Sequence, residues 1–151
     1  MTPITLYTTQ LVEERSIELP VATTLHRDDL GKIAAYLIGR KDREHMLALF
    51  LNSRAVVIGA SIVAIGHASG ITTSPKEVLR ASLLSGAPAL ALAHNHPSGE
   101  LAPSTEDIVF TNRLSNGAKT LGIVLLDHVI VHFDRYRSMD KECPSCFIET
   151  Q

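Results

Sequence analysis

The chain has the size and composition expected of one globular domain. It contains 151 residues, 45% of them hydrophobic and 20% charged, and 14 basic and 16 acidic residues give a net charge of −2. A chain of this length can bury a core without disulfides, and this composition excludes fibrous and disordered classes. There is no basic run of the kind that binds nucleic-acid phosphates.

Targeting and membrane signals are not recognised in the sequence. No apolar stretch reaches the roughly 18 residues that a membrane span needs, and the amino end "MTPITLYTTQLVEERS" lacks the pattern of a signal peptide. We therefore expect a cytoplasmic protein that does not contact a membrane.

The first half of the chain predicts an arm, a helix and a hairpin. Residues 1–23 show no sustained period, which indicates an arm or an edge strand. Apolar residues at helical spacing predict an amphipathic helix over residues 28–39. The runs "REHMLALFLN" and "AVVIGASIVAIG" have the composition of β-strands, and the polar bend at residues 52–54 between them predicts a β-hairpin.

The second half alternates helices and strands. Ser74 as a cap, Pro75 at the first helical position and Glu77 predict a helix over residues 75–86. The run "APALALAH" predicts a short buried strand, Ser104 to Gly122 a helix, and "IVLLDHVIVHF" a long strand. This order predicts a single α/β domain over residues 24–138, with helices packed on a mixed sheet, followed by a tail over residues 139–151.

The tail contains the pair Cys143 and Cys146 in the sequence "CPSC". Such a pair is half of a zinc site or a redox pair in other proteins, but the chain has no second pair and two cysteines cannot form a disulfide framework. We interpret the pair as an incidental feature of the tail.

The stretch "HNHPSGELAPSTED", residues 94–107, has the spacing of a metal site. Alternate residues of a strand share a face, so His94 and His96 present two imidazoles at the strand's end. A seven-residue turn brings the next helix back over that end and places Asp107 beside them. Two nitrogens and one carboxylate leave a fourth position open for water, which is the arrangement of catalytic zinc.

A purely structural interpretation of the same residues remains open. Ser104 to Asp107 matches a capping box, and Pro97 with Gly99 suits a tight turn. The two interpretations compete, because an Asp107 that binds metal cannot fully serve the cap. A catalytic site also needs a base and an oxyanion donor, for which Glu44 and Ser104 are the candidates.

The chain contains a glutamate and, further on, H-x-H, seven residues and S-x-x-D. This pattern resembles the signature of JAMM (MPN+) zinc metalloproteases, also called JAB domains. The segments "HNHPSG", "PSTED" and "LLDHVIVHFDRYRS" are similar to sequences of the RadC family in that group, and the resemblance covers residues 24–138. The resemblance implies a JAB/MPN-like, cytidine-deaminase-like fold and one Zn²⁺ per chain held by His94, His96 and Asp107. It also implies Glu44 as general acid and base, and Ser104 as the residue that stabilises the tetrahedral intermediate.

The remaining histidines require separate interpretation. The "DH" step at Asp127 and His128 resembles the family and suggests a partner for a metal-binding histidine, with Asp127 the better candidate. His26, His45, His67 and His132 have no metal-like spacing, and we expect ordinary packing or surface roles for them.

Three functions compete at this point. The first is a zinc-dependent metallopeptidase or isopeptidase whose peptide or protein substrate is unknown. The second is a DNA-repair-associated or DNA-processing accessory protein of the RadC type; longer RadC chains carry a helix-hairpin-helix region for which we expect no room here, so direct DNA binding would need a partner. The third is a non-catalytic metal-binding interaction module. Pairing of exposed sheet edges would permit a homo-oligomer.

Overall fold

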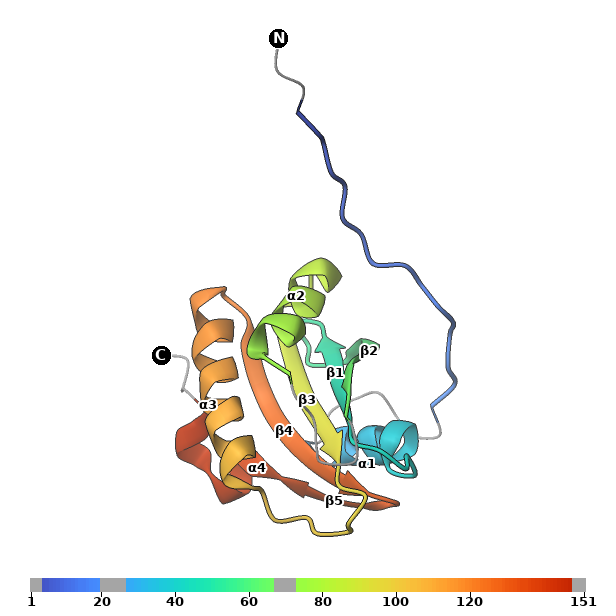
Figure 1. Cartoon of the computed structure of the whole chain (residues 1–151), viewed down its shortest axis with the longest axis vertical. Coiled ribbons are helices and arrows are strands. Elements are labelled where there is room, and N and C mark those ends of the chain that lie inside the picture. The colour runs from blue at the N-terminus through green and yellow to red at the C-terminus, as the bar shows by residue number, and fades with distance from the viewer. Residues whose placement is uncertain (1–3, 20–26, 67–72, 148–151) are drawn as a thin grey trace.

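The computed structural model describes residues 4–19, 27–66 and 73–147, and shows a five-stranded sheet with helices on both faces (Figure 1). The strands are β1 (His45–Leu51), β2 (Val57–Ile65), β3 (Ala89–Asn95), β4 (Val124–His132) and β5 (Arg135–Ser138). The helices are α1 (Arg27–Ile38), α2 (Pro75–Ser85), α3 (Thr105–Thr120) and the short α4 (Met139–Glu142), which a 3₁₀ turn, η1 (Pro144–Cys146), follows.

The sheet is mixed, as the sequence predicts. Its strand order is β2-β1-β3-β4-β5, and only β3 and β4 run parallel. A parallel pair needs a crossover, and α3 provides it between these two strands. The loop before α3 therefore leaves the carboxyl end of β3, in the middle of the sheet.

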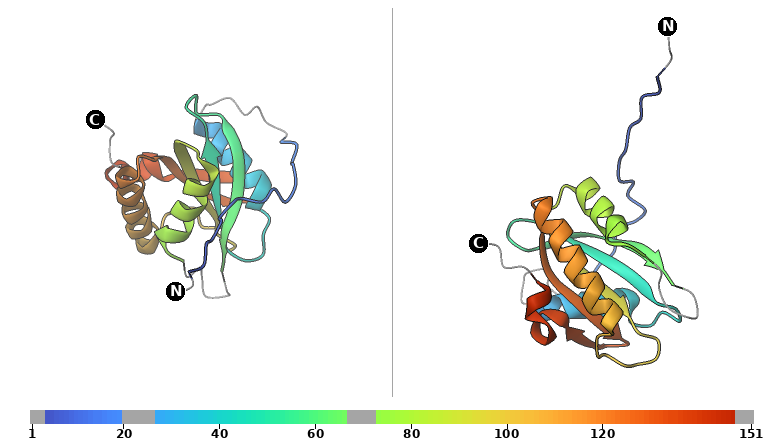
Figure 2. Two further views of the ribbon diagram at one scale, coloured as in Figure 1. Left: turned by 90° about the horizontal axis from the view of Figure 1, so that it is seen from above. Right: turned by 60° about the vertical axis from the view of Figure 1, so that its left-hand side comes forward.

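Two hydrophobic clusters hold the layers together. On one face α1 packs against β3, β4 and β5, while α2 and α3 cover the other face (Figure 2). All residues of β1 and β3 are buried, because these strands lie inside the sheet and between helices. This explains why both read as continuous apolar runs in the sequence.

Local signals account for most element ends. The side chain of Asn52 accepts the amides of Arg54 and Val56, which closes the predicted β1–β2 hairpin. Gly86 adopts a φ of 68° and ends α2. Ser74 precedes α2 as predicted, but its side chain forms no capping bond; its carbonyl accepts the Glu77 amide instead.

Residues 139–147, the described part of the tail, pack on the sheet and on α3. In α4, which the sequence does not predict, Met139 is fully buried, and α4 contacts β4 while η1 contacts α3. Cys143 and Cys146 are joined by a disulfide, and Cys146 is buried. The described part of the tail is therefore held to β4 and α3.

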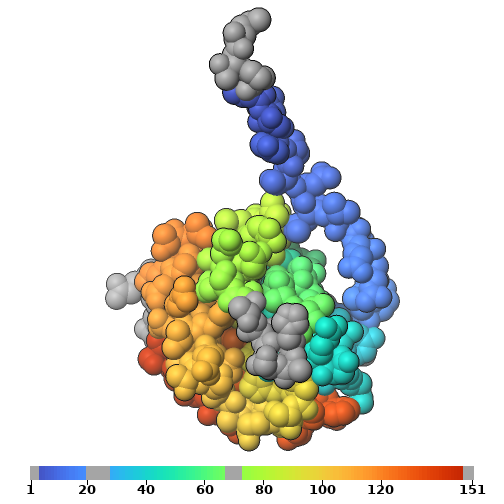
Figure 3. Space-filling view, viewed as in Figure 1, coloured from blue at the N-terminus to red at the C-terminus, as the bar shows by residue number. Residues whose placement is uncertain are grey.

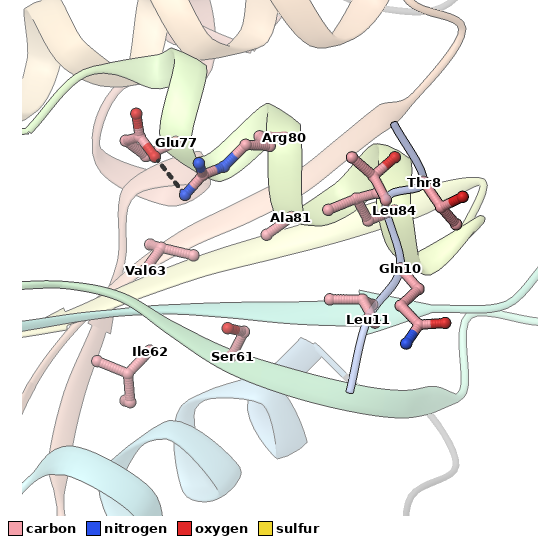
Figure 4. Close-up of a pocket in the computed structure, with 11 residues that line it drawn as sticks. Thr8, Gln10, Leu11, Ser61, Ile62, Val63, Glu77, Arg80, Ala81 and Leu84 are labelled. Atoms are coloured by element: carbon pink, nitrogen blue, oxygen red, sulfur yellow. Dashed lines mark ion pairs between the residues drawn. The ribbon is translucent and has the colours of Figure 1, made fainter. Parts of the chain in front are cut away.

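Residues 4–18 form an exposed arm without helix or strand that extends from the domain (Figure 3), and Leu19 is half-buried against the core. Thr8 to Leu11 line a pocket between the arm, β2 and α2, in which Arg80 and Glu77 form an ion pair of 2.8 Å (Figure 4). None of the candidate site residues lines this pocket. Within the described residues, no helix is both long and apolar enough to cross a membrane.

The contact between Gly31 of α1 and the ring of Tyr136 in β5 provides a test of the packing. A β-carbon at position 31 would overlap this ring, so we expect Gly31→Ala to lower the free energy of unfolding by about 1–3 kcal/mol despite the better helix propensity of alanine. Thermal and urea unfolding measure the change.

Gly117→Ala in α3 is the matched control, because a β-carbon there meets only the tip of the Leu79 side chain, at 2.9 Å. A Gly31→Ala protein as stable as the Gly117→Ala protein would contradict this packing.

Candidate metal centre

The two histidines of the H-x-H stretch lie at the carboxyl end of β3 and face the same side. Met46 pairs with His94 across the sheet, which places His94 on the α3 face together with Leu90 and Leu92. The Nε2 atoms of His94 and His96 are 2.8 Å apart. His94 is buried and His96 nearly so, because α3 covers this end of the strand.

The loop over residues 97–103 turns the chain toward α3, as Figure 1 shows below the end of β3. Gly99 adopts a φ of 86°, which is the backbone freedom that the sequence predicts for this position. The His96 carbonyl accepts the Gly99 amide at 3.0 Å, and Arg135 donates to the Gly99 carbonyl at 3.2 Å. These bonds fix the path that returns the chain to the histidines.

Asp107 joins the histidines and caps α3 at the same time. Its Oδ1 lies 3.1 Å from His94 Nε2, while its Oδ2 accepts the Ser104 amide at 2.8 Å and lies 3.6 Å from His96 Nε2. The Ser104 hydroxyl in turn accepts the Asp107 amide at 3.0 Å, which completes a capping box. The cap and the cluster, which we expected to compete, coexist because the cap uses Oδ2 and leaves Oδ1 facing His94.

A chain of hydrogen bonds behind His94 determines where its protons lie. Thr111 Oγ1 is 2.6 Å from the Asp107 carbonyl and 2.6 Å from His128 Nδ1, and His128 Nε2 is 2.8 Å from His94 Nδ1. The Thr111 hydroxyl has one proton, and its two short contacts are both satisfied only when it donates to the Asp107 carbonyl and accepts from His128; a third contact, with Met139 Sδ, is longer, at 3.7 Å. A neutral His128 then accepts from His94 Nδ1, which leaves a lone pair on His94 Nε2.

The second imidazole is oriented in the same manner. His96 Nδ1 lies 2.8 Å from the Glu100 carbonyl, to which it donates, so His96 Nε2 also carries a lone pair when the ring is neutral. Two imidazole lone pairs and a carboxylate oxygen thus converge. Partners of this kind behind ligating histidines are typical of metal sites.

The charge states agree with this arrangement. Burial, and then the neighbouring His94, hold the pKa of His128 well below its ordinary value, so His128 is neutral. Partial burial would raise the pKa of Asp107, but contacts with His94 and His96 hold it well below its ordinary value. Contact with Asp107 raises the pKa of His96. The cluster therefore attracts positive charge.

His128 takes the position that the sequence suggested for Asp127. Leu90 pairs with Leu125 and Leu92 pairs with His128, so β4 has one extra residue opposite β3. In a regular strand Asp127 would face Leu92; the bulge moves His128 to that face. The Asp127 carboxylate instead accepts bonds from the Ser138 hydroxyl at 2.6 Å and the Asp140 amide at 3.2 Å, and joins β4 to α4.

Glu44 precedes β1 and lies near the same end of the sheet. Extending the pairing of Met46 with His94 by two residues places Glu44 opposite His96. Glu44 is half-buried, and its charge contributes to the raised pKa of His96, so the carboxylate acts on the cluster. Its carbonyl accepts the Gly66 amide at 2.7 Å.

The other histidines differ in their surroundings. His45 is buried and bonds to the Arg43 carbonyl, and His132 Nδ1 bonds to the His96 carbonyl at 2.9 Å behind the loop. His26 and His67 lie outside the described residues. Thr111 was not predicted from the sequence, although it is a polar residue on the buried face of α3 one helical turn after Asp107, and this position is a recognisable signal.

The geometry of the three converging atoms fits a metal ion. One ligand atom from each of His94, His96 and Asp107 can be chosen so that all lie within 4.8 Å of one another. Zinc bonds of about 2.1 Å at tetrahedral angles separate ligand atoms by about 3.4 Å, close to the observed contacts. This is the only such group among the residues that the structure describes.

The fold and the site together define a class of protein: an α/β domain with a mixed sheet and a His-His-Asp group at the end of a central strand. Known proteins of this class include the family to which the chain is similar. Residues 25–143 match the RadC-like JAB domain, and the chain belongs to this family. The resemblance seen in the sequence is thereby confirmed.

Curated relatives carry the name UPF0758 protein. One from Carboxydothermus hydrogenoformans is 42% identical over 118 residues, which cover 78% of this chain and 52% of the relative. One from Methanococcoides burtonii is 41% identical over 66% of this chain and 44% of its own length, and one from Streptococcus suis is 36% identical over 78% and 48%. The chain spans about half the length of the curated relatives that it matches.

The hydrogen-bond chain behind His94 provides a test of the site. Thr111→Val removes the acceptor of the His128 proton, so His128 no longer holds His94 in one tautomer. With Zn²⁺ as the probe, we expect metal affinity to fall by about 10- to 100-fold, as measured by competition with a chelator.

Thr120→Val is the matched control, since Thr120 also donates to the carbonyl four residues earlier in α3 but is exposed and far along the helix from Asp107. Equal zinc affinity of the two variants would show that the chain does not act on the site.

Proposed function

We propose that this protein is a zinc-dependent hydrolase that cleaves a peptide or isopeptide bond with a metal-activated water. The observation that carries the proposal is the convergence of two imidazole lone pairs and one carboxylate oxygen, from His94, His96 and Asp107, at the end of β3. Three protein ligands with a fourth position left open are the arrangement of catalytic zinc, whereas structural zinc has four protein ligands.

His94 and His96 would hold the zinc through Nε2, and Asp107 through Oδ1, the oxygen that the cap does not use. A zinc ion bound there lowers the pKa of a water molecule and polarises a carbonyl group. The protein supplies the orientation: His128 and the Glu100 carbonyl hold the two rings, and the capping box holds Asp107.

Glu44 is the proposed general base. Its carboxylate lies near enough to His96 to influence the charge of that ring, and it belongs to the segment before β1 rather than to the ligand loop. A carboxylate in this position accepts the proton of the attacking water and returns it to the leaving amine. One residue thereby serves both halves of the hydrolysis.

Ser104 is the proposed oxyanion donor. Its Oγ accepts the Asp107 amide, so the oxygen is held while its own proton remains available, and the residue is exposed. A hydroxyl fixed in this manner donates to the negative oxygen that develops on an attacked carbonyl. The cap therefore supports the catalytic role of Ser104 rather than excluding it.

The substrate class is part of the proposal. The net charge of −2 provides little attraction for a nucleic-acid backbone, which disfavours phosphodiester cleavage by this chain alone. A DNA-repair-associated accessory role, motivated by the family name, and a non-catalytic metal-binding module are the alternatives that the experiments below separate.

Zinc content tests the ligand assignment. We expect one zinc per purified wild-type chain, and loss of zinc in His96→Ala and in Asp107→Asn. Asparagine keeps an oxygen for the Ser104 amide, so Asp107→Asn should retain α3 while losing the charged ligand. Elemental analysis and circular dichroism measure the two properties.

Glu106→Gln is the control, because it removes a neighbouring exposed carboxylate from the same helical turn. A folded wild type that contains no zinc and takes up none on dialysis against Zn²⁺ would overturn the proposal.

Activity tests the reaction. We expect the zinc-loaded wild type to cleave members of a mixed peptide and isopeptide library, read by mass spectrometry, and Glu44→Gln to reduce cleavage by about 100-fold or more while retaining zinc. Duplex and single-stranded DNA serve as parallel substrates. Cleavage of DNA alone would favour the DNA-processing alternative, and zinc-loaded protein inert on every substrate would favour the binding module.

A further inference from the structure

The residue between the two histidines, Asn95, faces away from the metal cluster. Residues alternate in β3, so His94 and His96 share the α3 face while Asn95 lies on the face of α1. Its side chain is 1% exposed, although asparagine is usually a surface residue. A buried amide needs hydrogen-bond partners, and the partners of Asn95 are informative.

All three hydrogen bonds of the Asn95 side chain reach one short segment. Nδ2 donates to the Lys41 carbonyl at 3.1 Å and to the Arg43 carbonyl at 3.0 Å, and Oδ1 accepts the His45 amide at 2.7 Å. These groups belong to the connection from α1 to β1. The amide therefore uses both donor protons and its acceptor on the residues that surround Glu44.

Within residues 27–66 and 73–147, this connection has few other hydrogen bonds to the sheet. It forms no strand before His45, and Lys41 and Arg43 are exposed. The Gly66 amide holds the Glu44 carbonyl from the β2 side. Asn95 bonds to the residues immediately before and after Glu44, so the backbone of Glu44 is held from both strands that neighbour it.

We propose that Asn95 is a positioning residue that fixes the Glu44 carboxylate relative to the metal cluster. The inference rests on the proposed function, because Asn95 would act through Glu44, the proposed general base. The residues of "HNH" then have two roles: the two histidines bind the metal, and the asparagine positions Glu44, the proposed base. The single strand β3 thereby sets the distance between the ligands and Glu44.

Asn95→Ala and Asn95→Asp test this role. Alanine removes all three bonds, and aspartate keeps the acceptor for the His45 amide but loses donors to the two carbonyls. Both variants retain the three ligands, so we expect one bound Co²⁺ per chain in each. We expect faster hydrogen exchange of the His45 amide in Asn95→Ala.

The visible spectrum of the cobalt-loaded protein reports the position of Glu44 without a substrate. A nearby carboxylate opposes loss of a proton at the site, so Glu44→Gln should lower the pH midpoint of the spectral change by about one pH unit. Asn95→Ala should lower it in the same direction, whereas Asn95→Asp adds a carboxylate of its own and is therefore read only by its cobalt content. In the double variant Glu44→Gln with Asn95→Ala, the second substitution should add little.

Asn52→Ala is the matched control. Asn52 also organises a turn next to β1 through its side chain, but at the opposite end of the strand. It should lower stability without moving the spectral midpoint, which separates positioning from a general structural effect.

Each outcome decides the proposal. A folded, cobalt-loaded Asn95→Ala with the wild-type midpoint would overturn it, as would loss of cobalt, which would mean that Asn95 acts on the ligands. If Glu44→Gln leaves the midpoint unchanged, the proposed role of Glu44 fails and the role of Asn95 fails with it. A shift in Glu44→Gln without one in Asn95→Ala overturns the Asn95 proposal alone.

Discussion

The candidate site depends on the hydrogen bonds that run from the Asp107 carbonyl through Thr111 and His128 to His94. Thr111 has only one proton, so the direction of every bond in this chain follows from its position. The consequence is a lone pair on His94 Nε2 that points at a carboxylate and at a second imidazole. Such a convergence of acceptors is unfavourable alone and favourable around a cation.

The sheet provides the elements of this chain from residues far apart in sequence. His94 comes from β3, His128 from β4 and Thr111 from α3, which is the crossover between those two parallel strands. Because the crossover packs on the same face, its first turn lies over the end of β3 and carries Asp107 to the histidines. The bulge in β4 then selects His128 over Asp127 as the side chain that contacts His94.

The start of α3 combines stability and chemistry in one carboxylate. The capping box satisfies amides of the first turn, which every helix must do, and it also holds Asp107 and Ser104 still. Since one oxygen of Asp107 serves the cap and the other faces His94, the structural and the metal-binding interpretations of these residues are both consistent with the molecule. In the proposal above, Asn95 holds the backbone on both sides of Glu44 from the opposite face of β3.

The sequence by itself determined the elements and the residues that meet. Apolar patterns predicted α1, α3 and the four longer strands, and the signals at Ser74, Pro75 and Glu77 predicted α2. The spacing of His94, His96 and Asp107 predicted their convergence, because the alternation of a strand and the length of a short loop are local properties. The short β5 and α4 were not predicted, since four residues carry too little pattern. Only the tertiary structure decided the partner of His94, the sharing of Asp107 and the contacts of Asn95. A bulge, a single shared carboxylate and a bond across 50 residues depend on how strands pair, and no local pattern encodes that.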